Sequence, residues 1–263
     1  METLQIIKIG GNIIDVPEKL HRFLTCFSRL KGNKILVHGG GKVATDISKD
    51  LGVESKMVDG RRITDAETLK IITMVYAGLI NKNIVAQLQA RQCNAIGLTG
   101  ADANLIPAKM RSTEVMDYGF VGDIQSEFIQ TKNLKLFLNN HLVPVFAPLT
   151  HDQKGSLLNT NADTIASCLA VALATDFKVN LIYCFEKPGV LMDPEVEDSL
   201  IKKINIRDYP SLKDKGIVSK GMIPKMDNAF HALKKGVRKV LICHADALNE
   251  NSEIEIQGTE LTI

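Results

Sequence analysis

The amino-acid sequence predicts an α/β fold in which helices cover both faces of a central, mostly parallel sheet. Short runs of β-branched residues alternate with longer amphipathic stretches from one end of the chain to the other. Several of the short runs are almost continuously apolar, as expected for strands that are buried on both faces. Together these observations indicate a three-layer αβα sandwich.

Each predicted strand is a short apolar run, and each predicted helix has apolar residues at helical spacing. We expect strands at residues 4–9, 34–38, 94–99, 142–149, 179–185 and 238–244, and helices at 17–30, 43–51, 65–90, 162–174 and 223–235. The third helix is preceded by Thr64 and contains Glu67, at the spacing of a capping box. Both side chains are therefore expected to satisfy backbone N–H groups of its first turn.

Two segments interrupt the alternation, and one seam divides the chain. Residues 56–63, which contain Asp59-Gly60, and residues 105–124 are expected to form hairpins. The seam falls near residues 175–178, between the fourth helix and the next strand. We therefore expect an N-terminal lobe, 1–175, and a C-terminal lobe, 176–263, that share one sheet.

Composition excludes several classes of protein. The 263 residues include 32 Lys and Arg against 30 Asp and Glu, a net charge of +2, which argues against nucleic-acid binding. The apolar runs fall short of the roughly 20 residues that a membrane helix needs, and the first residues lack signal-peptide features. The five scattered cysteines and the absence of an Asp, Glu and His cluster predict reduced thiols and no protein-bound metal. We expect a cytoplasmic protein.

Glycine-rich turns follow the first two predicted strands. The first strand ends in Lys8-Ile9-Gly10-Gly11 and the second in His38-Gly39-Gly40-Gly41. In a parallel sheet both turns emerge at the carboxyl edge, where α/β folds bind their ligands. Glycines let backbone N–H groups approach an anion, so the turns favour a phosphate site. Tight turns that only need positive φ would carry the same residues.

Two established phosphate motifs account poorly for these turns. The P-loop pattern fails, since Leu36 stands where its first glycine belongs and Val43 follows the lysine. A dinucleotide pattern occurs at Gly39, Gly41 and Ala44, but on the second strand rather than the first. Because the dinucleotide pattern is present, a nicotinamide-dependent oxidoreductase stays as an alternative function.

Two further motifs carry polar residues at helix starts. Pro224 suits the first turn of the last helix, and Lys225 beside it faces the positive end of the dipole, where a cation favours an anionic partner. Asn159, Asn161 and Asp163 open the fourth helix, either as a capping cluster or as groups that bind a ligand. Asp163 could then pair with the lysines of the other loops.

Taken in order, the motifs K-I-G-G, H-G-G-G, D-G-R-R-I-T, L-N-T-N-A-D and G-M-I-P-K resemble the amino-acid kinase superfamily, and within it the N-acetylglutamate kinases. The resemblance spans essentially the whole chain. It implies the amino-acid kinase fold and phosphoryl transfer from ATP to the side-chain carboxylate of N-acetyl-L-glutamate, a step in arginine biosynthesis. It also implies that Mg²⁺ is carried by ATP.

The resemblance implies a role for each motif residue. Catalytic and nucleotide-binding roles fall on Lys8, Lys225, Asp163, Gly10 and Gly11, and substrate-binding roles on Gly40, Gly41, Arg62, Asn159 and Asn161. Because a carboxylate nucleophile is already deprotonated at pH 7, Asp163 is expected to hold the two lysines rather than accept a proton. Arg62 suits the α-carboxylate, since its guanidinium donates two parallel hydrogen bonds.

Alternatives remain within and outside this family. The acceptor could carry another acyl group, as in N-succinyl-L-glutamate, or the chain could be another amino-acid kinase. A catalytically silent ligand-binding regulator is a further possibility, but it would not need Lys8 and Lys225 for transition-state charge.

The resemblance also bears on assembly. Arginine-inhibited relatives resemble one another in an N-terminal helix that links dimers into hexamers, and here the first strand is expected at about Leu4. We therefore expect a homodimer that is insensitive to arginine. The expected contact is one face of the helix at 65–90, which carries Leu69, Ile72, Thr73, Tyr76 and Leu79. The same face could instead pack on its own sheet.

Overall fold

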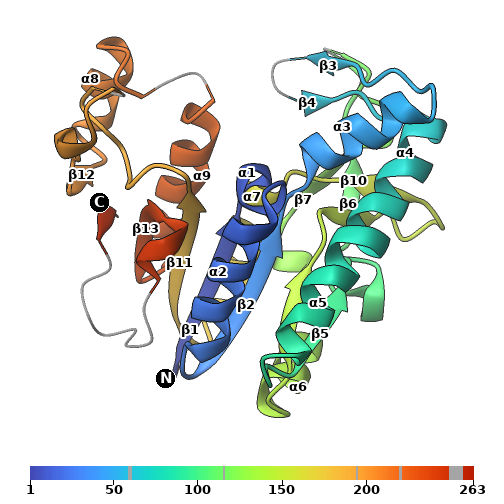
Figure 1. Cartoon of the computed structure of the whole chain (residues 1–263), viewed down its shortest axis with the longest axis horizontal. Coiled ribbons are helices and arrows are strands. Elements are labelled where there is room, and N and C mark those ends of the chain that lie inside the picture. Colours follow the sequence, from blue (N-terminus) through green and yellow to red (C-terminus); the bar gives the residue numbers. More distant parts are fainter. Residues whose placement is uncertain (59–60, 115, 194, 219–220, 249–256) are drawn as a thin grey trace.

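Helices lie on both faces of a central sheet in the computed structural model, which describes residues 1–58, 61–114, 116–193, 195–218, 221–248 and 257–263 (Figure 1). Within these residues the main sheet has eight strands in the order β12-β14-β13-β11-β1-β2-β8-β5. Their bounds are β1 (Thr3–Ile9), β2 (Asn33–His38), β5 (Ala95–Leu98), β8 (Val143–Phe146), β11 (Lys178–Phe185), β12 (Lys203–Asn205), β13 (Lys239–His244) and β14 (Gly258–Thr262). Only β13 and β14 pair in antiparallel fashion among them, which confirms the mostly parallel sheet.

Three small two-stranded sheets project from this framework. The predicted hairpins are present as β3 (Met57–Val58) with β4 (Arg61–Arg62), and as β6 (Ala108–Met110) with β7 (Gly122–Ile124). The Asp59-Gly60 turn lies outside the described residues. The strand predicted at 142–149 ends earlier, as β8, and Leu149 begins a separate strand, β9 (Leu149–His151), which pairs with β10 (Leu157–Asn159).

The helices form two layers around two cores. Their bounds are α1 (Gly11–Ile14), α2 (Pro17–Arg29), α3 (Gly41–Asp50), α4 (Ala66–Ile72), the π-helix η1 (Thr73–Ile80), α5 (Asn81–Gln89), α6 (Thr131–Asn139), α7 (Ala162–Leu173), α8 (Tyr209–Asp214) and α9 (Ile223–Lys234), with short 3₁₀ turns η2 (Asp102–Asn104), η3 (Ser126–Phe128), η4 (Glu197–Ser199) and η5 (Ala245–Ala247). Helices α6 to α9 cover one core, and α2 to α5 cover the other. The three layers confirm the predicted sandwich.

The long helix Ala66–Gln89 differs from the prediction in two respects. Its N-cap is Asp65, whose carboxylate accepts a hydrogen bond from the Thr68 N–H at 2.8 Å, so the predicted Thr64 capping box is wrong. Thr64 is buried and its hydroxyl donates to the Arg62 carbonyl instead. The apolar runs of the sequence were expected to be too short for a membrane helix. Among the described residues, however, this one helix is long and apolar enough to cross a membrane, and 44% of its most apolar window is buried within the fold.

Candidate active site at the carboxyl edge of the sheet

The two glycine turns lie against each other at the carboxyl edge of the sheet. Gly10 is the N-cap of α1, and Gly40 is the N-cap of α3. The Gly39 N–H donates to the Ile9 carbonyl at 3.1 Å, which fastens the second turn to the end of β1. The arrangement places the N-termini of α1 and α3 close together, where their backbone N–H groups favour an anion.

Gly40 is required by its surroundings as well as by its backbone. Its φ is +142°, a conformation that side chains with a Cβ atom rarely adopt. A Cβ atom there would also overlap the Cδ1 atom of Ile80 in the long helix. The positive-φ interpretation therefore holds at this position.

Asp163 lies between two lysines that come from different parts of the chain. Its carboxylate oxygens lie 2.7 Å from the Nζ atom of Lys8 on β1 and 3.7 Å from the Nζ atom of Lys225 in the first turn of α9. Lys8 and Asp163 are both buried, and the Lys225 side chain is 26% exposed. Two positive charges share one negative charge here, so the cluster has an excess positive charge that favours an anionic ligand.

The backbone around Asp163 is fixed by capping. Asn161 is the N-cap of α7, and its Oδ1 atom accepts hydrogen bonds from the N–H groups of Asp163 at 2.7 Å and Thr164 at 3.2 Å. The Tyr183 hydroxyl donates to the Asp163 carbonyl at 3.3 Å. The expected capping role of Asn161 is therefore confirmed, because its amide oxygen caps the helix that carries Asp163.

Arg62 lies at the first turn of α3. Its Nη2 atom donates to the Gly41 carbonyl and to the Thr45 hydroxyl, each at 2.8 Å, and its Nη1 atom donates to the Ser55 hydroxyl. The guanidinium is thus beside the glycine turn, although Arg62 is only 7% exposed. The structure brings this predicted residue together with Gly41.

Asn159 is linked to the same region through a residue that the sequence did not mark as functional. Its Nδ2 atom donates to the Thr64 hydroxyl at 2.9 Å, and Thr64 in turn donates to the Arg62 carbonyl at 3.1 Å. The hydroxyl therefore joins β4 to the end of β10. Thr64 is the threonine of the R-R-I-T motif and could have been found from that motif, but the sequence pattern assigned it to the capping box.

His38 supports the second glycine turn from behind. Its ring is fully buried, Nδ1 donates to the Gly39 carbonyl at 2.7 Å, and Nε2 accepts from the Asn81 amide at 3.2 Å in the tautomer that this geometry requires. Burial lowers the pKa of His38 to about 4, so the ring is neutral at pH 7.

The residue after β11 contacts the two helices that follow the first glycine turn. Glu186 accepts hydrogen bonds from the Asn12 amide and from Lys19, each at 2.7 Å, and these contacts hold the pKa of its carboxyl below the usual range. Residue 186 therefore ties the strand of the expected C-terminal lobe to α1 and α2 of the N-terminal lobe. The described residues contain no cluster of three His, Cys, Asp or Glu side chains that could hold a metal ion by themselves.

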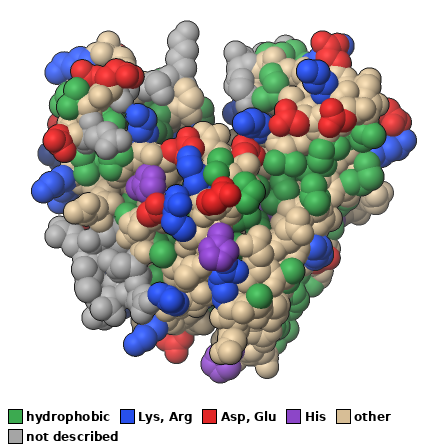
Figure 2. All heavy atoms as spheres, in the orientation of Figure 1, with side chains coloured by type: hydrophobic (Ala, Val, Ile, Leu, Met, Phe, Trp, Pro, Cys, Tyr) green, Lys and Arg blue, Asp and Glu red, His purple; other side chains and the backbone are tan. Residues whose placement is uncertain are grey.

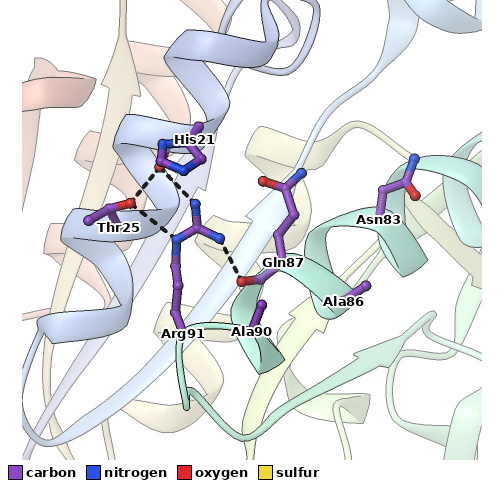
Figure 3. A pocket seen from close by; sticks show the side chains of 7 residues that line it. All are labelled: His21, Thr25, Asn83, Ala86, Gln87, Ala90 and Arg91. Carbon is purple, nitrogen blue, oxygen red and sulfur yellow. Dashed lines mark hydrogen bonds between the residues drawn. The ribbon is translucent and has the colours of Figure 1, made fainter.

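A hollow on the surface lies away from these groups. Figure 3 shows it between α2 and α5, where Arg91 donates to the Thr25 hydroxyl at 3.1 Å and to the Gln87 carbonyl at 2.7 Å. These two helices cover the face of the sheet opposite to α7 and α9. None of the predicted site residues is among the residues that line the hollow.

The chain matches known kinases along its whole length. The model of the amino acid kinase family matches residues 3–244. Curated acetylglutamate kinases from Cytophaga hutchinsonii and Phocaeicola vulgatus are 59% and 54% identical, covering 99% and 95% of this chain and 99% and 97% of their own lengths. The fold is shared with carbamate kinase from Giardia lamblia bound to AMP-PNP, at 14% identity, a TM-score of 0.67 and coverage of 99% and 98% of the two chains. A protein of Streptococcus mutans reaches 26% identity and a TM-score of 0.78, with 98% of each chain covered. This chain belongs to the amino acid kinase family.

Proposed function

We propose that the protein transfers the γ-phosphoryl group of ATP to the side-chain carboxylate of N-acetyl-L-glutamate and forms an acyl phosphate. The observation that carries the proposal is the Lys8–Asp163–Lys225 cluster beside two glycine turns. The full-length relatives named acetylglutamate kinase support the choice of acceptor. The product would serve arginine biosynthesis in the cytoplasm.

The two lysines provide the electrostatic part of the mechanism. Phosphoryl transfer spreads negative charge over the equatorial oxygens of the moving group, so positioned cations stabilise its transition state. Both carboxylate oxygens of Asp163 face a lysine, which suits a group that orients cations rather than one that accepts a proton. Gly10 and Gly11 would offer backbone N–H groups to the nucleotide phosphates.

Mg²⁺ would arrive with ATP and neutralise charge on its phosphates. Such an ion usually keeps several water ligands and takes few from the protein. Lys8 and Lys225 would then act on the oxygens that the ion does not cover.

The acceptor would bind between α3 and the end of β10. Arg62 would turn its fork from the Gly41 carbonyl and the Thr45 hydroxyl to the α-carboxylate, and the Gly40 and Gly41 N–H groups would accompany it. The amide of Asn159 would contact the acylated nitrogen region, with the free end of the Asn161 amide nearby. All of these residues belong to lobe 1–175, so we assign acceptor binding and dimer contacts to it. Lobe 176–263 would bind ATP, with Lys8, Gly10 and Gly11 of the first lobe beside its phosphates.

An acyl-phosphate trapping assay tests the proposal. The protein is incubated with ATP, Mg²⁺ and hydroxylamine, which converts an acyl phosphate into a coloured hydroxamate. N-acetyl-L-glutamate, N-succinyl-L-glutamate, free L-glutamate and N-acetyl-L-aspartate are compared at equal concentration. We expect the highest kcat/KM for N-acetyl-L-glutamate. Absence of hydroxamate with every acceptor would refute the kinase, and preference for another acceptor would refute the assignment of the acyl group.

We also propose a homodimer formed through the outward face of the helix Ala66–Gln89. The contact face expected from the sequence is partly wrong, because Ile72 and Tyr76 are buried in the chain's own core. Leu79 of the expected face is 47% exposed and Met74 is 57% exposed, and Figure 2 shows hydrophobic side chains gathered over this region. Apolar side chains in a contiguous exposed patch favour a protein partner.

Light scattering at micromolar protein tests the dimer. The double variant Met74→Glu with Leu79→Glu should give monomers, whereas Leu136→Glu, at a residue 57% exposed on α6, should leave the dimer intact. Millimolar arginine should change neither mass nor activity. A wild-type monomer, or a hexamer that arginine inhibits, would contradict the proposal.

A further inference from the structure

The last residue of β11 lies against both lysines of the cluster. The Nζ atoms of Lys8 and Lys225 lie 5.7 Å and 5.2 Å from the centroid of the Phe185 ring, on the face of the ring. Both distances are within the roughly 6 Å at which an ammonium group is attracted by an aromatic face. One ring therefore contacts two cations that come from β1 and α9.

The register of the sheet explains this placement. Lys8 on β1 is paired with Tyr183 on the neighbouring parallel strand β11, so their side chains point to the same face. Phe185 follows Tyr183 by two residues and shares that face. Tyr183 reaches the carbonyl of Asp163 with its hydroxyl, and Phe185 reaches the ammonium groups. Strand β11 thus supports all three members of the cluster.

The two ammonium groups of the cluster repel each other, and the ring can reduce this repulsion. Lys8 and Lys225 face a single carboxylate, so two like charges lie close together with only one opposite charge between them. The electron-rich face of an aromatic ring attracts cations, most strongly where water is excluded. Phe185 is partly buried against the core, and so is positioned to offset part of that repulsion before a phosphate arrives.

We propose that Phe185 is a positioning residue that holds the ammonium groups of Lys8 and Lys225 on either side of Asp163, in the arrangement that the transferring phosphoryl group requires. The proposal rests on the proposed kinase function for its kinetic consequence. Because the ring acts through lysines whose charge matters most in the transition state, its loss should lower kcat and leave KM for ATP and for the acceptor nearly unchanged.

Ring fluorination separates this role from simple packing. Phe185 is replaced site-specifically by mono-, di- and trifluorinated phenylalanine, which weakens the electron-rich face with little change of shape. We expect kcat to fall with each added fluorine, by about tenfold for the trifluorinated ring, the scale of two weak cation–π contacts. Phe185→Tyr should retain most activity, and Phe185→Leu should behave like the trifluorinated variant. Phe137 on α6 packs against the same core, and its fluorinated variants should keep the wild-type kcat.

A spectroscopic readout keeps the proposal testable apart from catalysis. In protein with ¹³C-labelled lysine, ring current should shift the ε-methylene signals of Lys8 and Lys225, and Phe185→Leu should remove both shifts. If wild type makes no acyl phosphate but the shifts are present, the proposed function fails and the contact stands. A flat fluorination series in an active enzyme, or ε-methylene signals that Phe185→Leu does not move, would overturn the positioning role.

Discussion

Burial of His38 should make the stability of the fold depend on pH. The neutral ring donates from Nδ1 to the Gly39 carbonyl and accepts at Nε2 from the Asn81 amide, so a second proton would face an N–H group. Burial lowers the folded-state pKa to about 4, against 6.5 in an unfolded chain. Between these values the unfolded state binds the proton and the folded state does not.

The sign and size of the effect follow from this difference. Stability from His38 is fully present above pH 6.5 and is lost as the pH falls toward 4, at about 1.4 kcal/mol per pH unit. Lowering the pH from 7 to 5 should therefore cost about 2 kcal/mol of unfolding free energy from this one residue.

Urea unfolding of wild type and His38→Gln at pH 7 and pH 5 measures the effect. Other groups also contribute to the pH dependence, and their contributions cancel when the two proteins are compared. We expect the wild type to lose about 2 kcal/mol more than His38→Gln between the two pH values. Equal losses in the two proteins would refute the argument from burial.

Three further predictions concern the candidate site. Lys8→Ala and Lys225→Ala should each lower kcat by about 100- to 1000-fold in the trapping assay, while the control Lys234→Ala on α9 should not. If either the Lys8 or the Lys225 variant keeps activity within a few-fold of wild type, the replaced lysine has no part in the mechanism. Arg62→Lys should raise KM for N-acetyl-L-glutamate by about 10- to 100-fold and KM for ATP far less, and equal effects would show that Arg62 does not bind the α-carboxylate. Asp163→Asn should be nearly as damaging as loss of a lysine, and an acidic limb of the wild-type pH–rate profile that disappears in this variant would indicate a general base instead.

The central strands could be predicted because each is an apolar run that needs no tertiary information. Strands β12 and β14 were missed because neither is a continuous apolar run. β12, at the edge of the described sheet, has three residues, and β14 beside it alternates buried Thr259 and Leu261 with more exposed positions. Short helices such as α8, with six residues, likewise carry too little periodic pattern. Short or weakly apolar patterns therefore account for these missed elements.

The long helix shows where a local pattern is ambiguous. Thr64 and Asp65 are both good N-cap residues, and only the burial of Thr64 beside Arg62 decides in favour of Asp65. Ile72 and Tyr76 repeat at helical spacing, but spacing alone does not distinguish a face that packs on the sheet from one that contacts a partner. Tertiary packing settled both questions.

The lysine cluster could be predicted in outline, because loops after parallel strands and the starts of their helices converge at one edge of the sheet. The pairing of Asp163 with both Lys8 and Lys225 agrees with that expectation. The role of Phe185 could not be predicted. A phenylalanine at the end of an apolar strand is typical of a core residue, and its two cationic neighbours come from β1 and α9.

Binding of a transition-state analogue tests the central claim most directly, namely that Lys8 and Lys225 stabilise the transferring phosphoryl group. Calorimetry would compare ADP with Mg²⁺ alone, and ADP with Mg²⁺, aluminium fluoride and N-acetyl-L-glutamate, on wild type and Lys225→Ala. We predict that the variant loses about 100-fold or more in affinity for the analogue complex and only a few-fold for ADP. Equal losses for both ligands, or none for either, would contradict the claim.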